Sequence, residues 1–170
     1  PSKERILMAI LFITQRVPYP PNKGEKLRTY HQIKHLLDKG YGITVACPIA
    51  DKQEAEYAQA LTDKLGVEVI SAPLRNTALS YVSAILTGQS LSEAKFYSAQ
   101  LTSLIHQALI SQNYTAIICS ASSLAQYIWD LPSALANSMS CIKVMDFMDL
   151  DSDKWAQYAT KAPWPMSWVY

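Results

Sequence analysis

Apolar runs of strand length alternate along the chain with longer segments in which apolar residues recur every three or four positions. The runs at 5–13, 42–48, 67–73, 115–120 and 142–147 are apolar on both faces and predict buried strands. Helical periodicity occupies 24–40, 51–65, 76–87 and 92–112. Buried strands joined by helices predict an α/β fold: a doubly wound, Rossmann-like parallel sheet with the strand order 3-2-1-4-5.

The ends of two helices can be read from single residues. Gly40 predicts the C-terminal stop of the first helix, and Asp51 predicts the N-cap of the second. The residues expected near one face of the first helix are Leu27, Tyr30, Ile33 (or Lys34) and Leu37.

Composition narrows the classes of protein that fit this pattern. Apolar residues make up 49% of the 170 residues, which predicts a globular domain, and a net charge of +1 gives no case for nucleic-acid binding. Three widely spaced cysteines in apolar surroundings indicate buried thiols and a cytoplasmic setting. No apolar run approaches the roughly 20 residues that span a bilayer, although peripheral contact with the inner membrane is compatible with the sequence.

The loop after the first strand, RVPYPPNKGEKLR at 16–28, stands where open α/β sheets bind phosphate groups. Neither G-x-G-x-x-G nor G-x-x-x-x-G-K-[ST] is present. The prolines stiffen the loop and deliver one glycine, Gly24, to the helix start, with Lys23, Lys26 and Arg28 around it. Lysines oppose the helix dipole there, so we expect an anion site; the alternative is a well-formed connection with solvated basic residues.

Acidic residues follow the last strand, in VMDFMDLDSDKWAQYA at 144–159. A calcium loop is rejected because its glycine and glutamate positions are not filled by those residues, and no metal is expected. Asp151 and Asp153 are expected to cap a helix. Asp146 and Asp149 come at the carboxyl end of the strand, where they would either face the crevice or bond the loop backbone.

Hydroxyl residues follow the fourth strand, in CSASSLAQY at 119–127. Ser120 is placed at the crevice, whereas Ser122 or Ser123 is expected to cap the helix that follows. The segment lacks G-x-S-x-G, so a nucleophile elbow is not supported.

The segments RVPYPPNKGEKLR (16–28), SSLAQY (122–127) and MDFMDLDSDKW (145–155) resemble the family 4 glycosyltransferases. The resemblance is strongest to the bacterial subgroup associated with exosortase and PEP-CTERM exopolysaccharide systems. It implies that residues 1–170 are the N-terminal, acceptor-side domain of a two-domain GT-B enzyme, with a C-terminal domain missing from this chain. Many family members have two adjacent glycines in the first loop, where this chain has Gly24 and Glu25.

The resemblance also implies a reaction and a set of site residues. A sugar would pass from a nucleotide-sugar donor to a saccharide or lipid-linked acceptor with retention of configuration and without a cofactor. The residues implied near the donor diphosphate are Gly24, Lys23, Lys26, Arg16 and Arg28. Those implied near the acceptor are Ser120, Asp146 and Asp149. The isolated domain is expected to transfer no sugar.

Two other functions remain open at the level of sequence. One is a non-catalytic Rossmann-like module that binds a nucleotide or a protein partner. The other is a metal-dependent GT-A transferase using Asp149-Leu150-Asp151 as its D-x-D motif. The terminal decapeptide 161–170 contains Trp164, Trp168 and Tyr170, which we expect to contact a second domain and to favour self-association of the isolated chain.

Overall fold

The computed structural model describes residues 8–74, 91–129 and 131–147. The strands described are β1 (Ala9–Ile13), β2 (Gly42–Ile49), β3 (Glu68–Pro73), β4 (Tyr114–Cys119) and β5 (Ile142–Met145). The helices described are α1 (Gly24–Asp38), α2 (Lys52–Leu65), α4 (Leu91–Phe96), α5 (Ala99–Ser111), α6 (Gln126–Trp129) and α7 (Ser133–Ser138), with a 3₁₀ turn η1 (Ser122–Leu124). The predicted helix at 76–87, Asp149, Asp151, Asp153 and the terminal decapeptide lie outside the described residues.

The strands of the described part form one sheet in the order β3-β2-β1-β4-β5, and every neighbouring pair is parallel. Both the fold class and the strand order predicted from sequence are confirmed. After β3 the chain returns to the other side of β1 as β4, so the strand order reverses between β1 and β4. Ligands bind at such switch points in open α/β sheets, outside the carboxyl ends of the strands.

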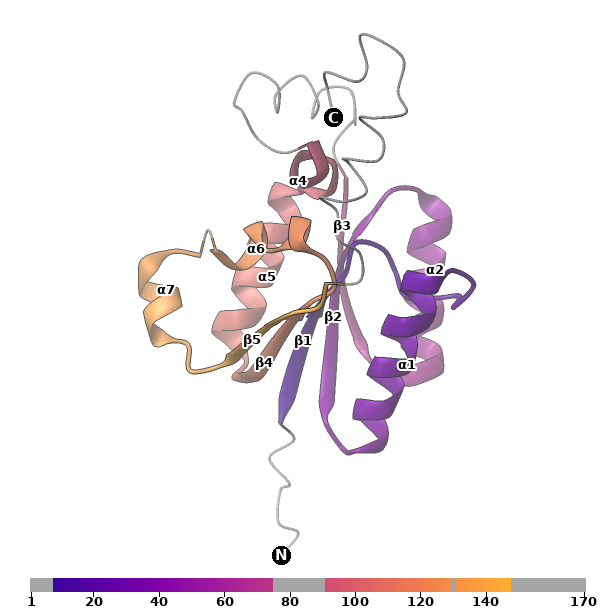
Figure 1. Cartoon of the computed structure of the whole chain (residues 1–170), viewed down its shortest axis with the longest axis horizontal. Coiled ribbons are helices and arrows are strands. Elements are labelled where there is room, and N and C mark those ends of the chain that lie inside the picture. Colours follow the sequence, from indigo (N-terminus) through magenta and orange to yellow (C-terminus); the bar gives the residue numbers. More distant parts are fainter. Residues whose placement is uncertain (1–7, 75–90, 130, 148–170) are drawn as a thin grey trace, which may run out of the picture.

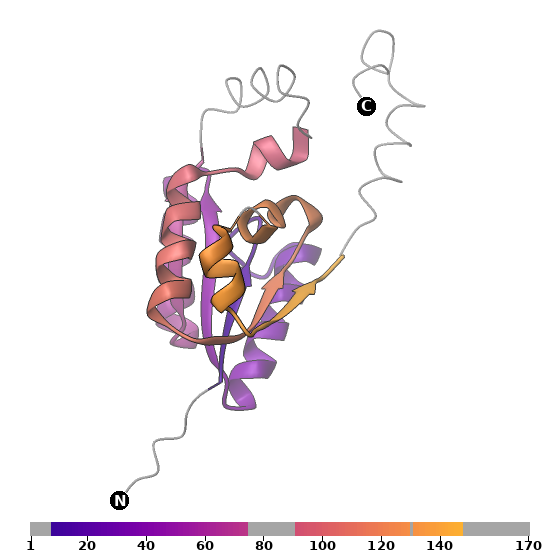
Figure 2. The ribbon, with the colours of Figure 1, turned by 90° about the vertical axis from the view of Figure 1, so that its left-hand side faces the viewer.

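Helices cover both faces of the sheet (Figures 1 and 2), with α1 and α2 on one face and α5, α6 and α7 on the other. β1 lies at the centre and alternates between the two cores. Ile10 and Phe12 pack with Ile33 of α1 and other residues of one cluster, whereas Leu11 belongs with Ile105 of α5 to the other. All five residues of β1 are buried, as the continuous apolar run predicts.

Helix ends are set by Asp51, Gly40 and Gly66, of which the first two were predicted from the sequence. Asp51 caps α2: its side chain accepts a hydrogen bond from the backbone N–H of Glu54 at 2.8 Å. Gly66 ends the same helix with φ +67°, and Gly40 follows α1 with φ +86°, in the left-handed region that glycine adopts without steric cost. The predictions for Asp51 and Gly40 are therefore confirmed.

The single helix predicted at 92–112 is wrong, because the structure divides it into α4 and α5. The break is held by a buried tyrosine from a distant segment. The hydroxyl of Tyr127 donates to the carbonyl of Phe96 at 2.6 Å and accepts from the N–H of Ser98 at 2.9 Å. Ser98 then caps α5 through the N–H of Leu101 at 3.4 Å.

The predicted buried face of α1 is partly wrong. Tyr30 and Ile33 are buried, but Leu27 is 45% exposed. Lys26 and Thr29 are buried instead. These two polar residues lie at the end of α1 that borders the carboxyl end of the sheet, where the neighbours are loops rather than apolar strands. Among the described residues, none of the helices is both long and apolar enough to span a membrane.

Candidate functional site

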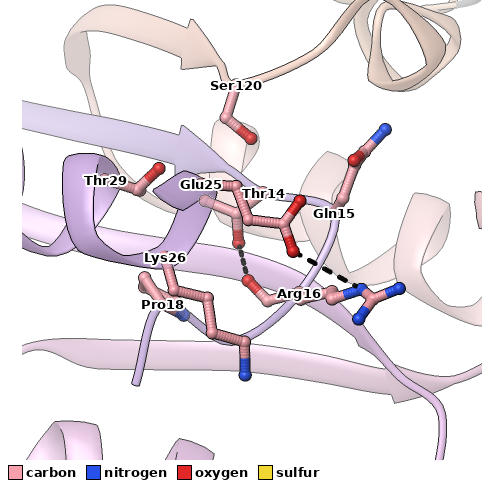
Figure 3. Close-up of a pocket in the computed structure, with 8 residues that line it drawn as sticks. All are labelled: Thr14, Gln15, Arg16, Pro18, Glu25, Lys26, Thr29 and Ser120. Atoms are coloured by element: carbon pink, nitrogen blue, oxygen red, sulfur yellow. Dashed lines mark hydrogen bonds and ion pairs between the residues drawn. The ribbon is translucent and has the colours of Figure 1, made fainter. Parts of the chain in front are cut away.

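A small pocket opens at the carboxyl ends of β1 and β4, at the switch point of the sheet (Figure 3). The loops after both strands continue the sheet bonding for one residue. The N–H of Thr14 donates to Ala46 and the N–H of Ser120 donates to Ile13, both at 2.9 Å. The cavity itself holds about 10 Å³, which is close to the space of one water molecule, and it opens to solvent. These are Thr14, Gln15, Arg16, Pro18, Glu25, Lys26, Thr29 and Ser120.

Two nearly buried residues, Thr29 and Ser120, bring hydroxyl groups to the pocket. Thr29 and Ser120 are only 3% and 4% exposed, yet within the described ranges neither hydroxyl hydrogen-bonds another protein group. The hydroxyl of Thr14, in contrast, donates to the carbonyl of Arg16 at 2.8 Å. In Figure 3 the Ser120 hydroxyl points toward Thr14 and Glu25. Among the described residues neither oxygen is a fully buried atom without a partner, so both reach the open part of the pocket and can bond a ligand polar atom that enters it.

The N-terminus of α1 lies beside this pocket. Its N-cap residue is Lys23, in an extended conformation, and no side chain caps the helix. The first intrahelical bond runs from the N–H of Leu27 to the carbonyl of Lys23 at 2.8 Å. A Cβ added at Gly24 would meet nothing within 4 Å, so this residue faces open space. The N–H groups of the first turn are therefore accessible to an anion, which the helix dipole also favours.

Lys26 connects the loop to two helices. Its ammonium donates to the carbonyl of Tyr19 at 3.4 Å and lies 5.4 Å from the ring centroid of Tyr57 on α2. Lys64 of α2 lies 5.7 Å from the ring centroid of Tyr19, which fixes the loop from a second side. Lys26 is 7% exposed, and burial lowers the pKa of its ammonium. In Figure 3 this ammonium points away from Ser120, so its contacts with Tyr19 and Tyr57 hold the loop.

Arg16 and Glu25 form an ion pair at the edge of the pocket. The distance between Nε of Arg16 and Oε1 of Glu25 is 3.7 Å, and the two side chains are 38% and 36% exposed. Glu25 lies in the first turn of α1, where the dipole favours a carboxylate. A pair this exposed and this long contributes little to stability, so either group can exchange its partner for a ligand.

A second polar cluster ties α1 to the end of β5. The carboxylate of Asp146 accepts from Nη2 of Arg28 at 2.7 Å and from Nε2 of Gln32 at 3.0 Å. Its backbone N–H donates to the carbonyl of Cys119 at 2.8 Å, which extends the β4–β5 pairing. Arg28 and Asp146, expected from sequence near different parts of the ligand, are thus bonded to each other.

Of the residues predicted for the site, Arg16, Lys26 and Ser120 meet at the pocket. The helix start places Gly24 and the exposed Lys23 beside it. Asp146 and Arg28 lie apart from the pocket lining in their own cluster, as described above.

Five lining residues were not among the predicted site residues: Thr14, Gln15, Pro18, Glu25 and Thr29. The first two are polar residues that directly follow a buried strand, which is a signal the sequence does contain. Gln15 also corrects one expectation. Its amide donates to the hydroxyl of Ser123 at 2.9 Å, and η1, which Ser123 was a candidate to cap, has no side-chain cap.

Comparisons with known proteins provide no family assignment. No family model and no curated protein matches this chain. Among solved structures, the chain is similar to an uncharacterized protein from Corynebacterium glutamicum, with 9% sequence identity and a TM-score of 0.36. That alignment covers 90% of this chain and 93% of the other.

Proposed function

We propose that this domain is the acceptor-side half of a retaining GT-B glycosyltransferase that acts in bacterial exopolysaccharide biosynthesis. One observation carries the proposal. A pocket with two hydroxyls that hydrogen-bond no described protein group lies at the switch point of the sheet, beside a helix N-terminus that no side chain caps. Anionic ligands favour such helix starts, and the sequence motifs of this loop resemble those of family 4 transferases.

The proposed reaction exchanges one bond at the anomeric carbon of the sugar. A bond forms between that carbon and the acceptor oxygen, and its bond to the donor phosphate oxygen breaks. The electron pair leaves with the nucleoside diphosphate, and the acceptor proton passes to a phosphate oxygen of this leaving group. Charge developing on the diphosphate would be stabilised by the N–H groups near Gly24 and by Arg16 and Lys23, without a required metal.

The acceptor would enter from the side of the pocket formed by the end of β4. The open hydroxyls of Ser120 and Thr29 can each donate to or accept from a sugar hydroxyl. Asp146 retains acceptor capacity beyond its bonds to Arg28 and Gln32, since a carboxylate offers about four lone-pair positions. Asp149 remains a predicted acceptor contact.

A non-catalytic module is the second candidate function. The bonds from Arg28 and Gln32 to Asp146 favour it, because they give this carboxylate a structural role that requires no substrate. Such a module would bind a nucleotide at the start of α1 and transfer nothing.

A transfer assay separates these functions. The longest encoded protein that contains this domain, and the 170-residue chain alone, are incubated with UDP-glucose, GDP-mannose and dTDP-glucose in excess EDTA. We expect transfer by the former only. Turnover by the 170-residue chain would contradict the two-domain assignment. Loss of activity on chelation, restored by Mn²⁺, would favour the D-x-D transferase, and nucleotide binding without any transfer would favour the non-catalytic module.

A further inference from the structure

The pocket contains its own carboxylate. Glu25 lines it together with Arg16 and lies in the first turn of α1, next to the N–H groups that would receive a ligand anion. The 3.7 Å contact with Arg16 gives this carboxylate the position that a phosphate oxygen would otherwise take against the guanidinium. The helix dipole favours both anions for the same reason.

We infer that Glu25 is an internal competitor for the anion site, which lowers the affinity of this site for the diphosphate group of its ligand. This inference rests on the proposed function, because it concerns the same site. When a diphosphate binds, Arg16 exchanges the carboxylate for a phosphate oxygen, and Glu25 moves toward solvent. When the product leaves, Glu25 returns to Arg16 and the site regains its charge balance.

Three features of the pocket support the exchange. The ion pair is long and partly exposed, so it is weak enough to be replaced. A diphosphate also gains what a carboxylate does not, namely charge-assisted bonds to several N–H groups at once. Finally, the hydroxyls of Thr29 and Ser120, assigned above to the acceptor, bond no described protein group, so the ion pair of Arg16 and Glu25 is the pocket contact that a diphosphate has to displace.

The charges around Arg16 and Glu25 predict the sign of the effect. Lys23 and Lys26 lie on the same helix start, and the pKa of Lys26 responds to the nearby charges of Glu54, Lys23, Arg16 and Glu25, in addition to its burial. Of the two carboxylates in this group, Glu25 lines the pocket, whereas Glu54 accepts from the N–H of Ala50. Removing the charge of Glu25 should therefore strengthen anion binding.

The experiment measures binding of inorganic pyrophosphate to the 170-residue chain by amide chemical shifts at low ionic strength. Glu25→Gln should lower the dissociation constant on the order of 3- to 10-fold, as expected for freeing an exposed pair and removing one like charge. Glu56→Gln removes the same charge from an exposed position of α2, away from the pocket, and should leave the constant within about 1.5-fold. In a chain that also carries Arg16→Gln, Glu25→Gln should change the logarithm of the dissociation constant by at most about half as much as it does in the parent.

The outcomes distinguish the competitor role of Glu25 from the presence of a diphosphate site. Unchanged or weaker binding by Glu25→Gln, with clear binding by the parent, would overturn the competitor and leave the diphosphate site standing. Absence of binding by both proteins would overturn the competitor together with the diphosphate site of the proposed function. Urea unfolding of each variant checks that it is folded, and Glu25→Ser provides a second removal of the charge.

Discussion

Replacing Gly24 by alanine tests the site most directly, because its effects on stability and on binding should have opposite signs. In the free chain the added Cβ meets nothing within 4 Å, and Gly24 is not among the glycines with positive φ. Alanine also restricts the unfolded chain more than glycine does. We therefore expect the free energy of unfolding to rise by about 0.4–1 kcal/mol.

Binding should weaken for the same geometric reason. In the proposed function a diphosphate approaches the first N–H groups of α1 through the open space beside Gly24, so a methyl group there would keep a phosphate oxygen from hydrogen-bond distance. Loss of one charge-assisted hydrogen bond removes about 1.5–3 kcal/mol. At 1.4 kcal/mol per factor of ten, the dissociation constant for pyrophosphate should rise about 10- to 100-fold.

The assay combines urea unfolding with a pyrophosphate titration of the parent and the variant. Gly66→Ala is the matched control, because Gly66 ends α2 with φ +67°. Alanine in that left-handed conformation should lower the free energy of unfolding by about 1–2 kcal/mol and leave pyrophosphate binding unchanged. Binding by Gly24→Ala within about twofold of the parent would refute the reasoning that a ligand approaches the chain at this glycine.

Three further predictions concern stability. Tyr127→Phe removes the hydroxyl that joins α4 to α5 and should lower the free energy of unfolding by about 2–4 kcal/mol, measured by urea unfolding. The control Tyr114→Phe loses one hydrogen bond of 3.2 Å and should lower it by about 1 kcal/mol. A loss of stability for Tyr127→Phe no larger than that for Tyr114→Phe would contradict the role of this hydroxyl at the α4–α5 break. Asp146→Ala should lower stability by about 1–2 kcal/mol in the same assay, an effect that 1 M NaCl should reduce but not abolish because the carboxylate is mostly buried. Burial raises the pKa of Cys47 and Cys119 from 9.0 to about 12. The unfolded chain therefore loses these protons first. Stability present below pH 9 should fall by up to about 1.4 kcal/mol per pH unit and per thiol between pH 9 and 12. A Cys47→Ala, Cys119→Ala variant should lose this contribution, while the raised pKa of the buried tyrosines Tyr114 and Tyr127 leaves a fall above pH 10.

The strands and their order followed from the sequence because each strand is a short apolar run. The prediction that all of them are buried holds for β1 and β2, but the edge strand β5 is largely exposed and β3 is only partly buried. A run that is apolar on both faces predicts a parallel sheet covered by helices on both sides. The helix predicted at 92–112 failed for a different reason. Its break depends on the hydroxyl of Tyr127, about thirty residues further along the chain, and periodicity carries no information about such a contact.

The sequence predicted where the pocket lies but not all of the residues that line it. A glycine after the first strand and a serine after the fourth mark the carboxyl edge of the sheet, and Ser120 does line the pocket. The role of Thr29 was hidden because helical periodicity assigns the buried face to apolar residues such as Leu27. The pairing of Arg28 with Asp146 joins segments more than a hundred residues apart, and it depends on how closely α1 approaches β5.

The position of β1 between β2 and β4 sets the order in which this protein can acquire its pocket during folding. β1, β2 and β3 are close in sequence and can pair early, but β4 is separated from β1 by about a hundred residues. The entropy of closing that long segment delays its pairing, since non-local contacts form late in such topologies. Until β4 arrives, one edge of β1 is unpaired and Ser120 is far from Thr14. A newly synthesised chain therefore exposes an aggregation-prone apolar edge throughout the period before it has a binding site.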